Sequence, residues 1–508
     1  MNMQTGPLSP ARPAPGGEEW PRLLIIGAGM SGILMAIKAR EAGISHVTIV
    51  EKAASVGGTW RENRYPGLAC DVPSHSYSYS FAPNPFWSKR FSEGPEICKY
   101  LEDVAADYGL DKKIEFGTEI ISTRFENGVW HAAARDGRRF EAEFIVCATG
   151  ILHHPHKPSI DGLESFAGDA FHTAEWDDSV SLEGKRVGII GTGSTSAQIV
   201  GDITDKVGHL SLFQRTPQWI FPQPHVTYKG WVKRMWAKMP WTQKMIRDIQ
   251  LWLFRWTFAR AVVQEGWQRK LISWITRKHL KMAVKDPVLR DKLTPDYAPA
   301  CKRLIFSASF YKAIQAPHAA LVTEEIERIE PEGVRTKDGT VHPLDVLVLA
   351  TGFKAHNFMR PMEVLGEGGR SLNAYWAEQT TNFKSVGIPH FPNFFMLNGP
   401  GSPIGNFSLI WIAELQVGYI LSLIDEAREK GLTSLAPKEA AAKAFQAEVQ
   451  EGMQSTVWLT GGCSSWYFDA NGNLTLWPFT PDRFREEMTS PSLDDYEITR
   501  APVLAAAE

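Results

Sequence analysis

The stretch RLLIIGAGMSGILMAIKAREAG, residues 22–43, decides the fold. A short apolar run precedes Gly27, Gly29 and Gly32, and a helical pattern follows them. At this spacing the first glycine permits a tight turn, the second lets backbone approach a pyrophosphate, and the third lets the helix pack on its strand. The stretch therefore predicts a strand, a phosphate-binding turn and a helix whose N-terminus faces the phosphates.

The next apolar run ends at the residues that discriminate between dinucleotides. HVTIVEK ends in Glu51 and Lys52, and Glu51 lies 24 residues past Gly27. A carboxylate at this place can accept hydrogen bonds from both hydroxyls of an unphosphorylated ribose. The first unit is therefore predicted to bind FAD or NAD.

The same plan recurs in KRVGIIGTGSTSAQIVGDI, residues 185–203. Its predicted turn contains Gly191, Thr192, Gly193, Ser194 and Thr195, and Ser196 takes the place of the third glycine. The following run, HLSLF, leads into Gln214 and Arg215. A guanidinium suits a ribose 2'-phosphate, which a carboxylate would repel, so the second unit is predicted to bind NADPH.

Two further runs, FIVCATG and VLVLATG, end at Gly150 and Gly352 and complete the repeat. We predict an α/β fold with two dinucleotide-binding, Rossmann-like domains, one for FAD and one for NADP. The predicted organisation is a flexible tail at 1–20, the first part of the FAD domain at 21–150, the NADP domain at 151–389, and the second part of the FAD domain with a C-terminal active-site loop at 390–508.

Composition and charge bear on the class of protein and on its compartment. The chain has 508 residues and a net charge of -3, which gives no electrostatic reason to expect nucleic acid. No run of 18 apolar residues predicts a membrane span, and the Pro- and Gly-rich start lacks the features of a signal peptide, so we predict a cytoplasmic protein. Five scattered cysteines, at 70, 98, 147, 301 and 463, argue against a disulfide framework and a zinc site.

A tryptophan-rich segment interrupts the second unit. Eight of the 18 tryptophans lie between residues 219 and 274. Apolar residues at three- and four-residue spacing over 222–300 predict a helical insertion broken by Pro240. Three interpretations remain open: helices that pack on the NADP domain and line substrate access, a dimer contact, and a peripheral membrane patch.

Three segments give the chain a family resemblance. GGTWRENRYPGLACD at 57–71, FAGDAFHTAEWD at 166–177 and CKRLIF at 301–306 match motifs of the class B flavoprotein monooxygenases. The second segment fits the fingerprint F-x-G-x-x-x-H-x-x-x-W-[PD], so the chain resembles, more narrowly, a type I Baeyer–Villiger monooxygenase. The resemblance covers roughly residues 20 to 485.

This resemblance implies a reaction and its residues. It implies that NADPH reduces FAD, that O2 adds to give a flavin C4a-peroxide, and that one oxygen enters beside a ketone carbonyl to give an ester or lactone, with sulfoxidation as a side activity. It makes Arg303 and Asp71 the catalytic pair, because arginine keeps its proton and can hold an anion. The further cofactor contacts that it implies are Thr59, Trp60, Tyr77, Lys302 and Trp466.

His172 of the fingerprint has no second histidine or cysteine at the spacing of metal ligands, so we predict that the protein holds no metal. We predict instead that His172 and Trp176 brace the link between the two domains.

The main alternative function is an N- or S-oxygenating flavin-containing monooxygenase. A flavin disulfide reductase would need a Cys-x4-Cys pair where only Cys70 is present, and a non-catalytic NADPH sensor is the third alternative. The sequence leaves open whether the protein is a monomer or a homodimer.

Overall fold

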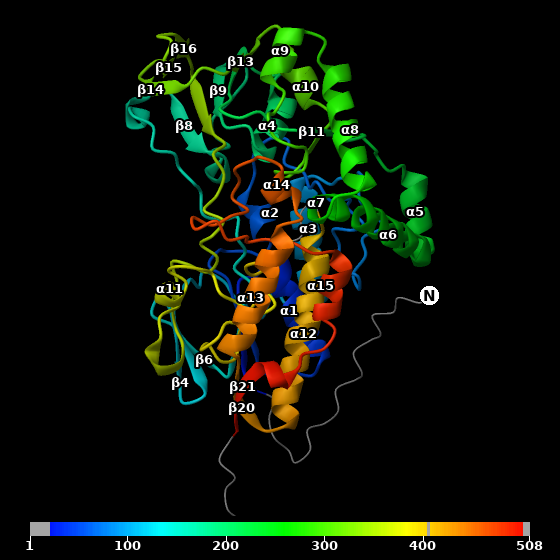
Figure 1. Ribbon diagram of the computed structural model, residues 1–508, viewed down its shortest axis with the longest axis vertical. Coiled ribbons are helices and arrows are strands. Elements are labelled where there is room, and N and C mark those ends of the chain that lie inside the picture. Colours follow the sequence, from blue (N-terminus) through cyan, green and yellow to red (C-terminus); the bar gives the residue numbers. More distant parts are fainter. Residues whose placement is uncertain (1–20, 404–406, 501–508) are drawn as a thin grey trace, which may run out of the picture.

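The computed structural model describes residues 21–403 and 407–500 (Figure 1). The predicted N-terminal tail therefore lies outside the described residues. The described chain forms two five-stranded parallel sheets, one in each half of Figure 1, with helices around them.

The first sheet is built around the opening glycine turn. Its strand order is β19-β7-β1-β2-β3, and every neighbouring pair is parallel. The strands are β1 (Leu23–Ile26), β2 (Val47–Val50), β3 (Ile114–Glu115), β7 (Phe144–Cys147) and β19 (Phe394–Met396), and α1 (Met30–Glu41) follows the turn. β1 and β7 are buried along their whole length, which explains why both read as unbroken apolar runs.

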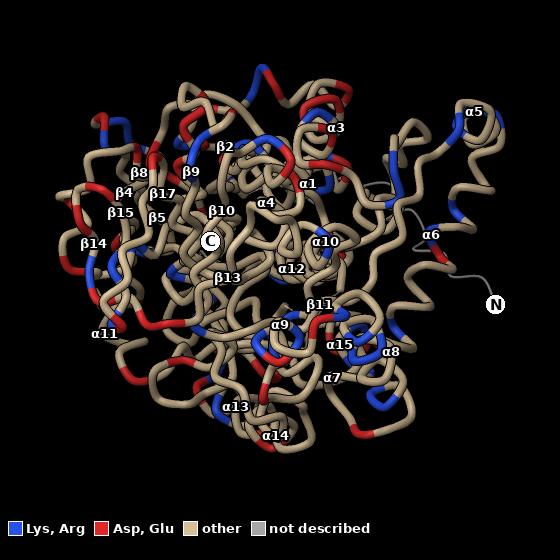
Figure 2. Tube along the Cα trace, turned by 90° about the horizontal axis from the view of Figure 1, so that it is seen from above, with Lys and Arg blue, Asp and Glu red and all other residues tan. Residues whose placement is uncertain are grey.

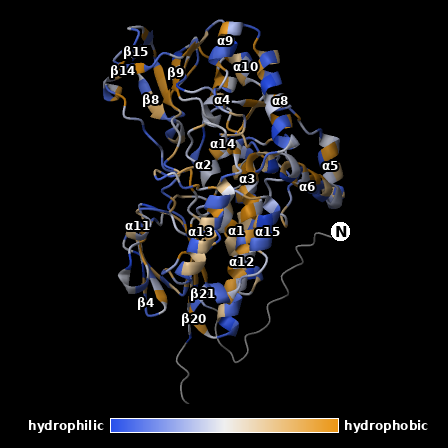
Figure 3. Ribbon diagram, in the orientation of Figure 1, coloured by the Kyte–Doolittle hydropathy of each residue, from blue (hydrophilic) through white to orange (hydrophobic). Residues whose placement is uncertain are grey.

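The second sheet repeats this arrangement. Its order is β13-β10-β9-β17-β8, again all parallel. The strands are β8 (Asp169–His172), β9 (Arg186–Ile190), β10 (His209–Phe213), β13 (Ala319–Val322) and β17 (Val346–Leu349), and α4 (Ser194–Ile203) follows the second turn. Figure 3 shows β9 mostly in the hydrophobic colour, as expected for a strand that is buried from Val187 onward. The predicted α/β fold with two Rossmann-like units is confirmed.

Close backbone contacts explain the glycines of both turns. A Cβ at Gly27 would lie 2.6 Å from the Ala148 carbonyl oxygen, and one at Gly32 would lie 1.8 Å from the Gly27 carbonyl oxygen. A Cβ at Gly191, whose φ is +114°, would lie 2.4 Å from the Ala350 carbonyl oxygen. Each turn therefore packs directly against the Ala-Thr-Gly end of the neighbouring strand, where a side chain has no room.

A mixed sheet, with one parallel and two antiparallel strand pairs, and an antiparallel sheet accompany the two parallel ones. The first, in the order β18-β4-β5-β6, consists of β4 (Ile120–Glu126), β5 (Val129–Ala134), β6 (Arg139–Ala142) and β18 (Glu363–Leu365). The second contains β14 (Ile326–Glu330), β15 (Gly333–Thr336) and β16 (Val341–Pro343). Phe358 and Trp376 share a core with Leu24 and Trp130. The segment from β18 to residue 389 was predicted to belong to the second domain, and we now propose that the chain returns to the first domain near residue 353.

The C-terminal helices cover the first sheet. α12 (Leu409–Glu429), α13 (Glu439–Met453) and α15 (Pro481–Glu487) share one core with α1 and α3 (Gly94–Asp107). Residues 457–476 pack instead into the core of the second unit. The remaining elements are α2 (Thr59–Glu62), β11 (Ile220–Pro222), β12 (Ile305–Ser307), α10 (Phe310–Ala313), α11 (Leu372–Tyr375), α14 (Val457–Thr460), β20 (Leu432–Pro437), β21 (Tyr496–Arg500) and short 3-10 turns at Leu163–Ser165, Thr173–Glu175, Glu367–Gly369 and Leu493–Asp495.

The predicted insertion is helical. It contains α5 (Gly230–Lys238), α6 (Pro240–Phe254), a π-helical stretch (Arg255–Ala259), α7 (Arg260–Val263), α8 (Trp267–Ala283) and α9 (Pro287–Lys292). The break at Pro240 is confirmed, because Pro240 is the first residue of α6 and lacks the N–H that a continuous helix needs. Across the described ranges, no helix is both long and apolar enough to cross a bilayer.

The close packing at Gly32 gives a first prediction. Gly32→Ala should lower the free energy of unfolding by about 3 kcal/mol, because the new Cβ meets backbone that cannot move aside. Urea unfolding followed by tryptophan fluorescence measures this. The matched control is Gly418→Ala in α12, where no atom lies within 4 Å of the new Cβ and where alanine should stabilise the helix by up to about 1 kcal/mol. Equal losses in both variants would contradict the packing argument.

Candidate active site

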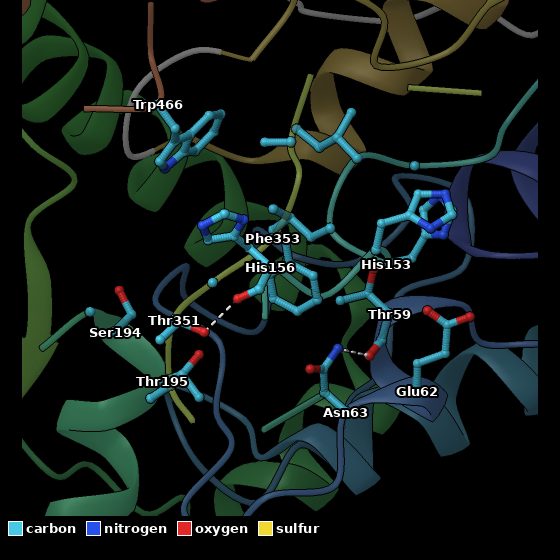
Figure 4. Close-up of a pocket in the computed structure, with 18 of the residues that line it drawn as sticks. Thr59, Glu62, Asn63, His153, His156, Ser194, Thr195, Thr351, Phe353 and Trp466 are labelled. Atoms are coloured by element: carbon cyan, nitrogen blue, oxygen red, sulfur yellow. Dashed lines mark hydrogen bonds between the residues drawn. The ribbon is translucent and has the colours of Figure 1, made fainter. Parts of the chain in front are cut away.

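A single cavity of about 1590 Å³ is lined by both dinucleotide units. Figure 4 shows Ser194, Thr195 and Trp466 on one side of it and Thr59, Glu62 and Asn63 on the other. Every site residue predicted from the sequence lines this cavity except Gly32 and Ser196. Those two are buried where α1 and α4 pack on their strands, the role that the third glycine position has in this motif.

Glu51 is fixed at the end of β2 in the first unit. Its carboxylate accepts hydrogen bonds from the backbone N–H of Ala28, at 2.8 Å, and of Ala53, at 2.9 Å. Lys52 lies on the rim, with Nζ 3.7 Å from Glu62 Oε1. The turn backbone at Gly27 and Gly29 borders the cavity, and so does Glu51, so the residues fit a dinucleotide whose ribose is unphosphorylated.

Two aromatic side chains of the first unit, Trp60 and Tyr77, border the cavity. Trp60 Nε1 donates a hydrogen bond to Tyr77 Oη at 3.2 Å, and the two rings pack edge to face. Tyr77 Oη donates in turn to Met30 Sδ at 3.3 Å. Burial raises the pKa of Tyr77, so its hydroxyl stays protonated. Thr59, at the start of α2, borders the cavity beside this pair.

Two cations border the cavity in the second unit. Arg215 and Lys302 have no carboxylate partner within 4 Å among residues 21–403 and 407–500. Burial, and then repulsion from Arg215, lowers the pKa of Lys302. Two neighbouring cations that form no ion pair in the described part of the chain fit a doubly charged phosphate.

The loops around these cations are anchored by hydrogen bonds. Thr192 Oγ1 donates to the Thr216 carbonyl oxygen at 2.7 Å, which ties the glycine turn to the loop that carries Arg215. Gln214 Nε2 donates to the Lys292 carbonyl oxygen at 2.7 Å. Gln214 was predicted to contact a cofactor, and the structure engages its amide nitrogen in holding the loop.

Arg303 and Asp71 form a bidentate ion pair between the two units. Arg303 Nε lies 2.7 Å from Asp71 Oδ2, and Nη2 lies 2.6 Å from Oδ1. The Arg303 side chain is 39% exposed, on the lining of the cavity. Burial alone would lower the pKa of Arg303, but the charge and hydrogen bonds of Asp71 outweigh it and hold the pKa above its ordinary value. The guanidinium is therefore a permanent cation, and Nη1 has no acceptor in the described part of the chain.

The fingerprint residues lie at the edge of the second sheet. His172 ends β8, opposite Leu349 of β17, and its Nδ1 accepts a hydrogen bond from the Ala174 N–H at 3.1 Å. Burial lowers the pKa of His172, so the ring is neutral at pH 7. Arg64 of the first unit donates to the Trp176 carbonyl oxygen at 3.4 Å and pairs with Asp178 at 2.9 Å. The Arg64 contacts join the two units, whereas the His172 hydrogen bond is local, and the bracing role of His172 and Trp176 stays a prediction.

Comparison with known proteins identifies the family. The family described as pyridine nucleotide-disulphide oxidoreductase matches residues 24–250. An uncharacterized monooxygenase of Mycobacterium tuberculosis is 43% identical, over 96% of this chain and 98% of its own length. A Baeyer-Villiger monooxygenase of Streptomyces coelicolor is 38% identical, over 96% of this chain and 94% of its own length. The chain belongs to the Baeyer–Villiger monooxygenases.

A solved structure agrees with this membership. The cyclohexanone monooxygenase from Rhodococcus sp. Phi1 bound to NADP+ superposes with a TM-score of 0.84 at 27% identity, over 96% of this chain and all of that one. The resemblance drawn from the three sequence motifs is thus confirmed. The protein is a flavoprotein monooxygenase of the Baeyer–Villiger type.

One expectation about this Baeyer–Villiger monooxygenase is wrong. Cys301 and Cys463, 162 residues apart, form a disulfide with Cα atoms 6.0 Å apart. Residue spacing gave no sign of it, because the pair is created where the C-terminal stretch packs into the second core. The bond ties the segment that carries Lys302 and Arg303 to the loop that carries Trp466. Cys70, Cys98 and Cys147 are free.

The structure also adds residues that sequence reasoning missed. Tyr467 is buried on the cavity lining, and Arg303 lies close enough to influence its pKa, which burial raises. Asn398 borders the cavity and donates through Nδ2 to Ser31 Oγ at 3.0 Å. Tyr467 could have been found as the neighbour of Trp466, whereas Asn398 lies in no motif and is placed by β19.

The disulfide gives a second prediction. Alkylation of the unfolded, unreduced protein should modify three of the five cysteines, and peptide mapping should find Cys301 linked to Cys463. Because the bond closes a long loop, Cys463→Ser should lower the free energy of unfolding by about 2–5 kcal/mol. Cys98→Ser, at a free and partly exposed thiol, is the control and should leave stability unchanged. Five alkylated cysteines without reductant would rule the bond out.

Proposed function

We propose that this Baeyer–Villiger monooxygenase binds FAD in the first unit and NADPH in the second, and uses O2 to insert one oxygen beside the carbonyl of a ketone. The product is an ester or a lactone. The observation that carries the proposal is the Arg303–Asp71 pair, placed on the lining of a cavity that both dinucleotide units share.

The residues present fit both cofactors. Glu51 borders the first turn and can accept ribose hydroxyls, while Arg215 and Lys302 border the second turn and can bind a 2'-phosphate. When bound and reduced, the flavin supplies the activation of O2. The cofactor contacts that we propose besides these are Gly27, Gly29, Lys52, Thr59, Trp60, Tyr77, Gly191, Thr192, Gly193, Ser194, Thr195 and Trp466.

The role of Arg303 follows from its charge. Oxygen insertion beside a carbonyl develops negative charge on oxygen, and a proton donor that gave up its proton would quench that charge. A guanidinium keeps its proton, and its free Nη1 can donate a hydrogen bond to the charged oxygen. One such donor in a preorganised site contributes about 3–4 kcal/mol to transition-state stabilisation. Asp71 orients the guanidinium through two hydrogen bonds and so keeps it directed into the cavity.

The alternatives fit the cavity less well. Oxygenation of a soft nitrogen or sulfur nucleophile does not need a fixed cation that holds an anion, so the Arg303–Asp71 pair favours ketones, with sulfoxidation as a side activity. A disulfide reductase needs a cystine that faces the flavin. Cys301 and Cys463 lie outside the lining of the described cavity, so their bond does not favour that reaction.

We place the enzyme in the cytoplasm, as a monomer or a homodimer. Disulfides are rare in that compartment because cytosolic reductants keep thiols reduced. The side chain of Cys301 is fully buried and that of Cys463 is partly buried, so reductants have access to the bond from the Cys463 side only.

Replacement of Arg303 tests the reaction. Arg303→Ala should still bind FAD and be reduced by NADPH, yet ester formation from a ketone should fall by about 10²–10³-fold, because the donor at the developing charge is lost. Stopped-flow absorbance at the flavin band measures reduction, and product mass measures oxygenation. Arg303→Lys should retain part of the activity, since it keeps a cation without the bidentate geometry.

Two controls make the Arg303 result interpretable. Arg138→Ala removes an arginine that pairs with Glu115 and Asp136 on the surface, and should change neither step. Ester formation at the wild-type rate in Arg303→Ala would overturn the role proposed for Arg303. A variant that is reduced normally and has lost only oxygenation supports it.

Replacement of Arg215 tests the nicotinamide cofactor. Arg215→Ala should raise the KM for NADPH by about 10–100-fold and leave the KM for NADH unchanged, because a charge-assisted contact to the 2'-phosphate is lost. Steady-state oxidation of both nucleotides measures this. Lys185→Ala, an exposed lysine at the start of the second unit, is the control. Equal changes for NADPH and NADH would contradict the phosphate contact.

A further inference from the structure

The helical insertion exposes an unusual number of large apolar side chains. Of the 19 large hydrophobic residues that are exposed among the described ones, 12 lie between residues 231 and 282. We call this surface the basic aromatic face. Its apolar members are Trp231, Met239, Trp241, Met245, Ile249, Trp252, Leu253, Trp256, Trp267, Leu271, Trp274 and Met282.

The polarity of α6 is inverted relative to an ordinary surface helix. Its exposed apolar residues follow one stripe at helical spacing, from Trp241 through Met245 and Ile249 to Trp252, and Trp256 of the π-helical stretch continues that stripe. Its inward face is mostly polar: Thr242, Gln243 and Gln250 are buried there, and Phe254 joins the first core at the C-terminal end of the helix.

Two glutamines on that inward face are held by the protein. Gln243 Nε2 donates to the Asn84 carbonyl oxygen at 2.6 Å, and Gln250 Oε1 accepts from Ser76 Oγ at 3.1 Å. In α6 the glutamines are buried and the tryptophans are exposed. This arrangement is typical of a helix whose outer side contacts an apolar environment such as a membrane.

The helix α8 continues this pattern. Trp267, Leu271 and Trp274 form its exposed stripe, and the two tryptophans are 62% and 57% exposed. The opposite face, with Ile272 and Leu280, packs into the core of the second unit. The insertion was one candidate for the lining of substrate access, but none of its described residues lines the cavity. The outer stripe of α8 thus has no role in the site described above.

Charge distinguishes this surface from the rest of the molecule. Residues 229–285 contain 14 Lys and Arg against two Asp and Glu, whereas the whole chain has a net charge of -3. Three of these cations, Arg247, Arg255 and Arg260, pair with Glu414 or Asp482 outside the segment. Figure 2 shows α5 and α6 standing away from the body of the molecule, with Lys and Arg along α5 and α8. Lys278 lies over the ring of Trp274 at 4.5 Å, and Arg260 over the ring of Trp256 at 3.8 Å, so cations and aromatic rings share one surface.

These charges decide between two partners for the face. A second copy of the chain packed symmetrically against it would bring two surfaces of the same positive sign together. An anionic lipid surface instead attracts the cations, and its interfacial region takes up tryptophan rings and leucine side chains. This combination of cationic and aromatic side chains is typical of helices that lie in the plane of a membrane interface.

We propose that the basic aromatic face docks the enzyme on anionic lipid bilayers as a peripheral membrane protein. The tryptophans of α6 and α8 insert at the headgroup level, and the lysines and arginines around them contact lipid phosphates. This association goes beyond the proposed oxygenation and does not depend on it, because the bilayer contacts are made outside the cavity.

Vesicle sedimentation of the full-length, FAD-loaded protein tests the proposal. At 150 mM salt the protein should sediment with vesicles of phosphatidylcholine and 30% phosphatidylglycerol and remain in solution with pure phosphatidylcholine. The triple variant Trp241→Ser, Trp252→Ser, Trp274→Ser should bind the anionic vesicles at least about tenfold more weakly. Lys238→Gln, Lys270→Gln, Lys281→Gln together should weaken binding by about 10–100-fold.

A matched control uses lysines elsewhere on the surface. Lys112→Gln, Lys113→Gln, Lys185→Gln removes as many exposed charges outside the face and should leave vesicle binding unchanged. Wild-type protein that stays in solution with anionic vesicles would overturn the proposal, and so would unchanged binding by the tryptophan variant. If light scattering shows that the wild-type protein is a dimer and the tryptophan variant a monomer, the face is a contact between copies and the membrane proposal fails. NADPH oxidation by each variant reports that it is folded.

Discussion

The ion pair between Arg303 and Asp71 is the interaction on which the architecture of the site depends. The two residues lie 232 positions apart in the chain, and each comes from a different dinucleotide unit. Neighbouring contacts hold the same junction: Gln198 of α4 donates to the Ala69 carbonyl oxygen, and Tyr65 Oη donates to Gln198 Oε1. A Cβ at Gly67 would lie 2.6 Å from the Gln198 carbonyl oxygen, so backbone meets backbone there. The motif at 57–71 therefore lies at the interface between the two units.

The paired charges and the nearby disulfide serve the same region. A guanidinium that is only partly exposed would be costly without a partner, and Asp71 offsets that cost while leaving one nitrogen for the cavity. Two residues before Arg303, Cys301 is bonded to Cys463. The loop with Trp466 and Tyr467 is thereby held close to the guanidinium. The cation, its acid partner and the covering loop form one connected unit.

Much of the site could be predicted from local sequence, because its parts belong to short motifs. Gly27 and Gly191 mark turns whose backbone conformation is set within a few residues, and Glu51 and Arg215 follow them at a fixed distance. Asn398 could not be predicted in this way, since it borders the cavity only because β19 joins a sheet whose other strands lie in the first 150 residues. For the same reason the sheet that β18 joins could not be predicted: its partner strand β4 precedes it by more than 200 residues in the chain.

By itself the sequence determined the repeated strand–turn–helix units, the opposite signs of Glu51 and Arg215, the helical character of the insertion and the family. All of these depend on periodicity, steric demands and charge within short windows. Only the tertiary structure decided that Cys301 meets Cys463, that the expected Arg303–Asp71 pair is bidentate, and that α6 turns its glutamines inward and its tryptophans outward. The spacing of apolar residues fixes which side chains share a face of a helix. It does not fix which face is covered, because that depends on what the rest of the chain packs against it.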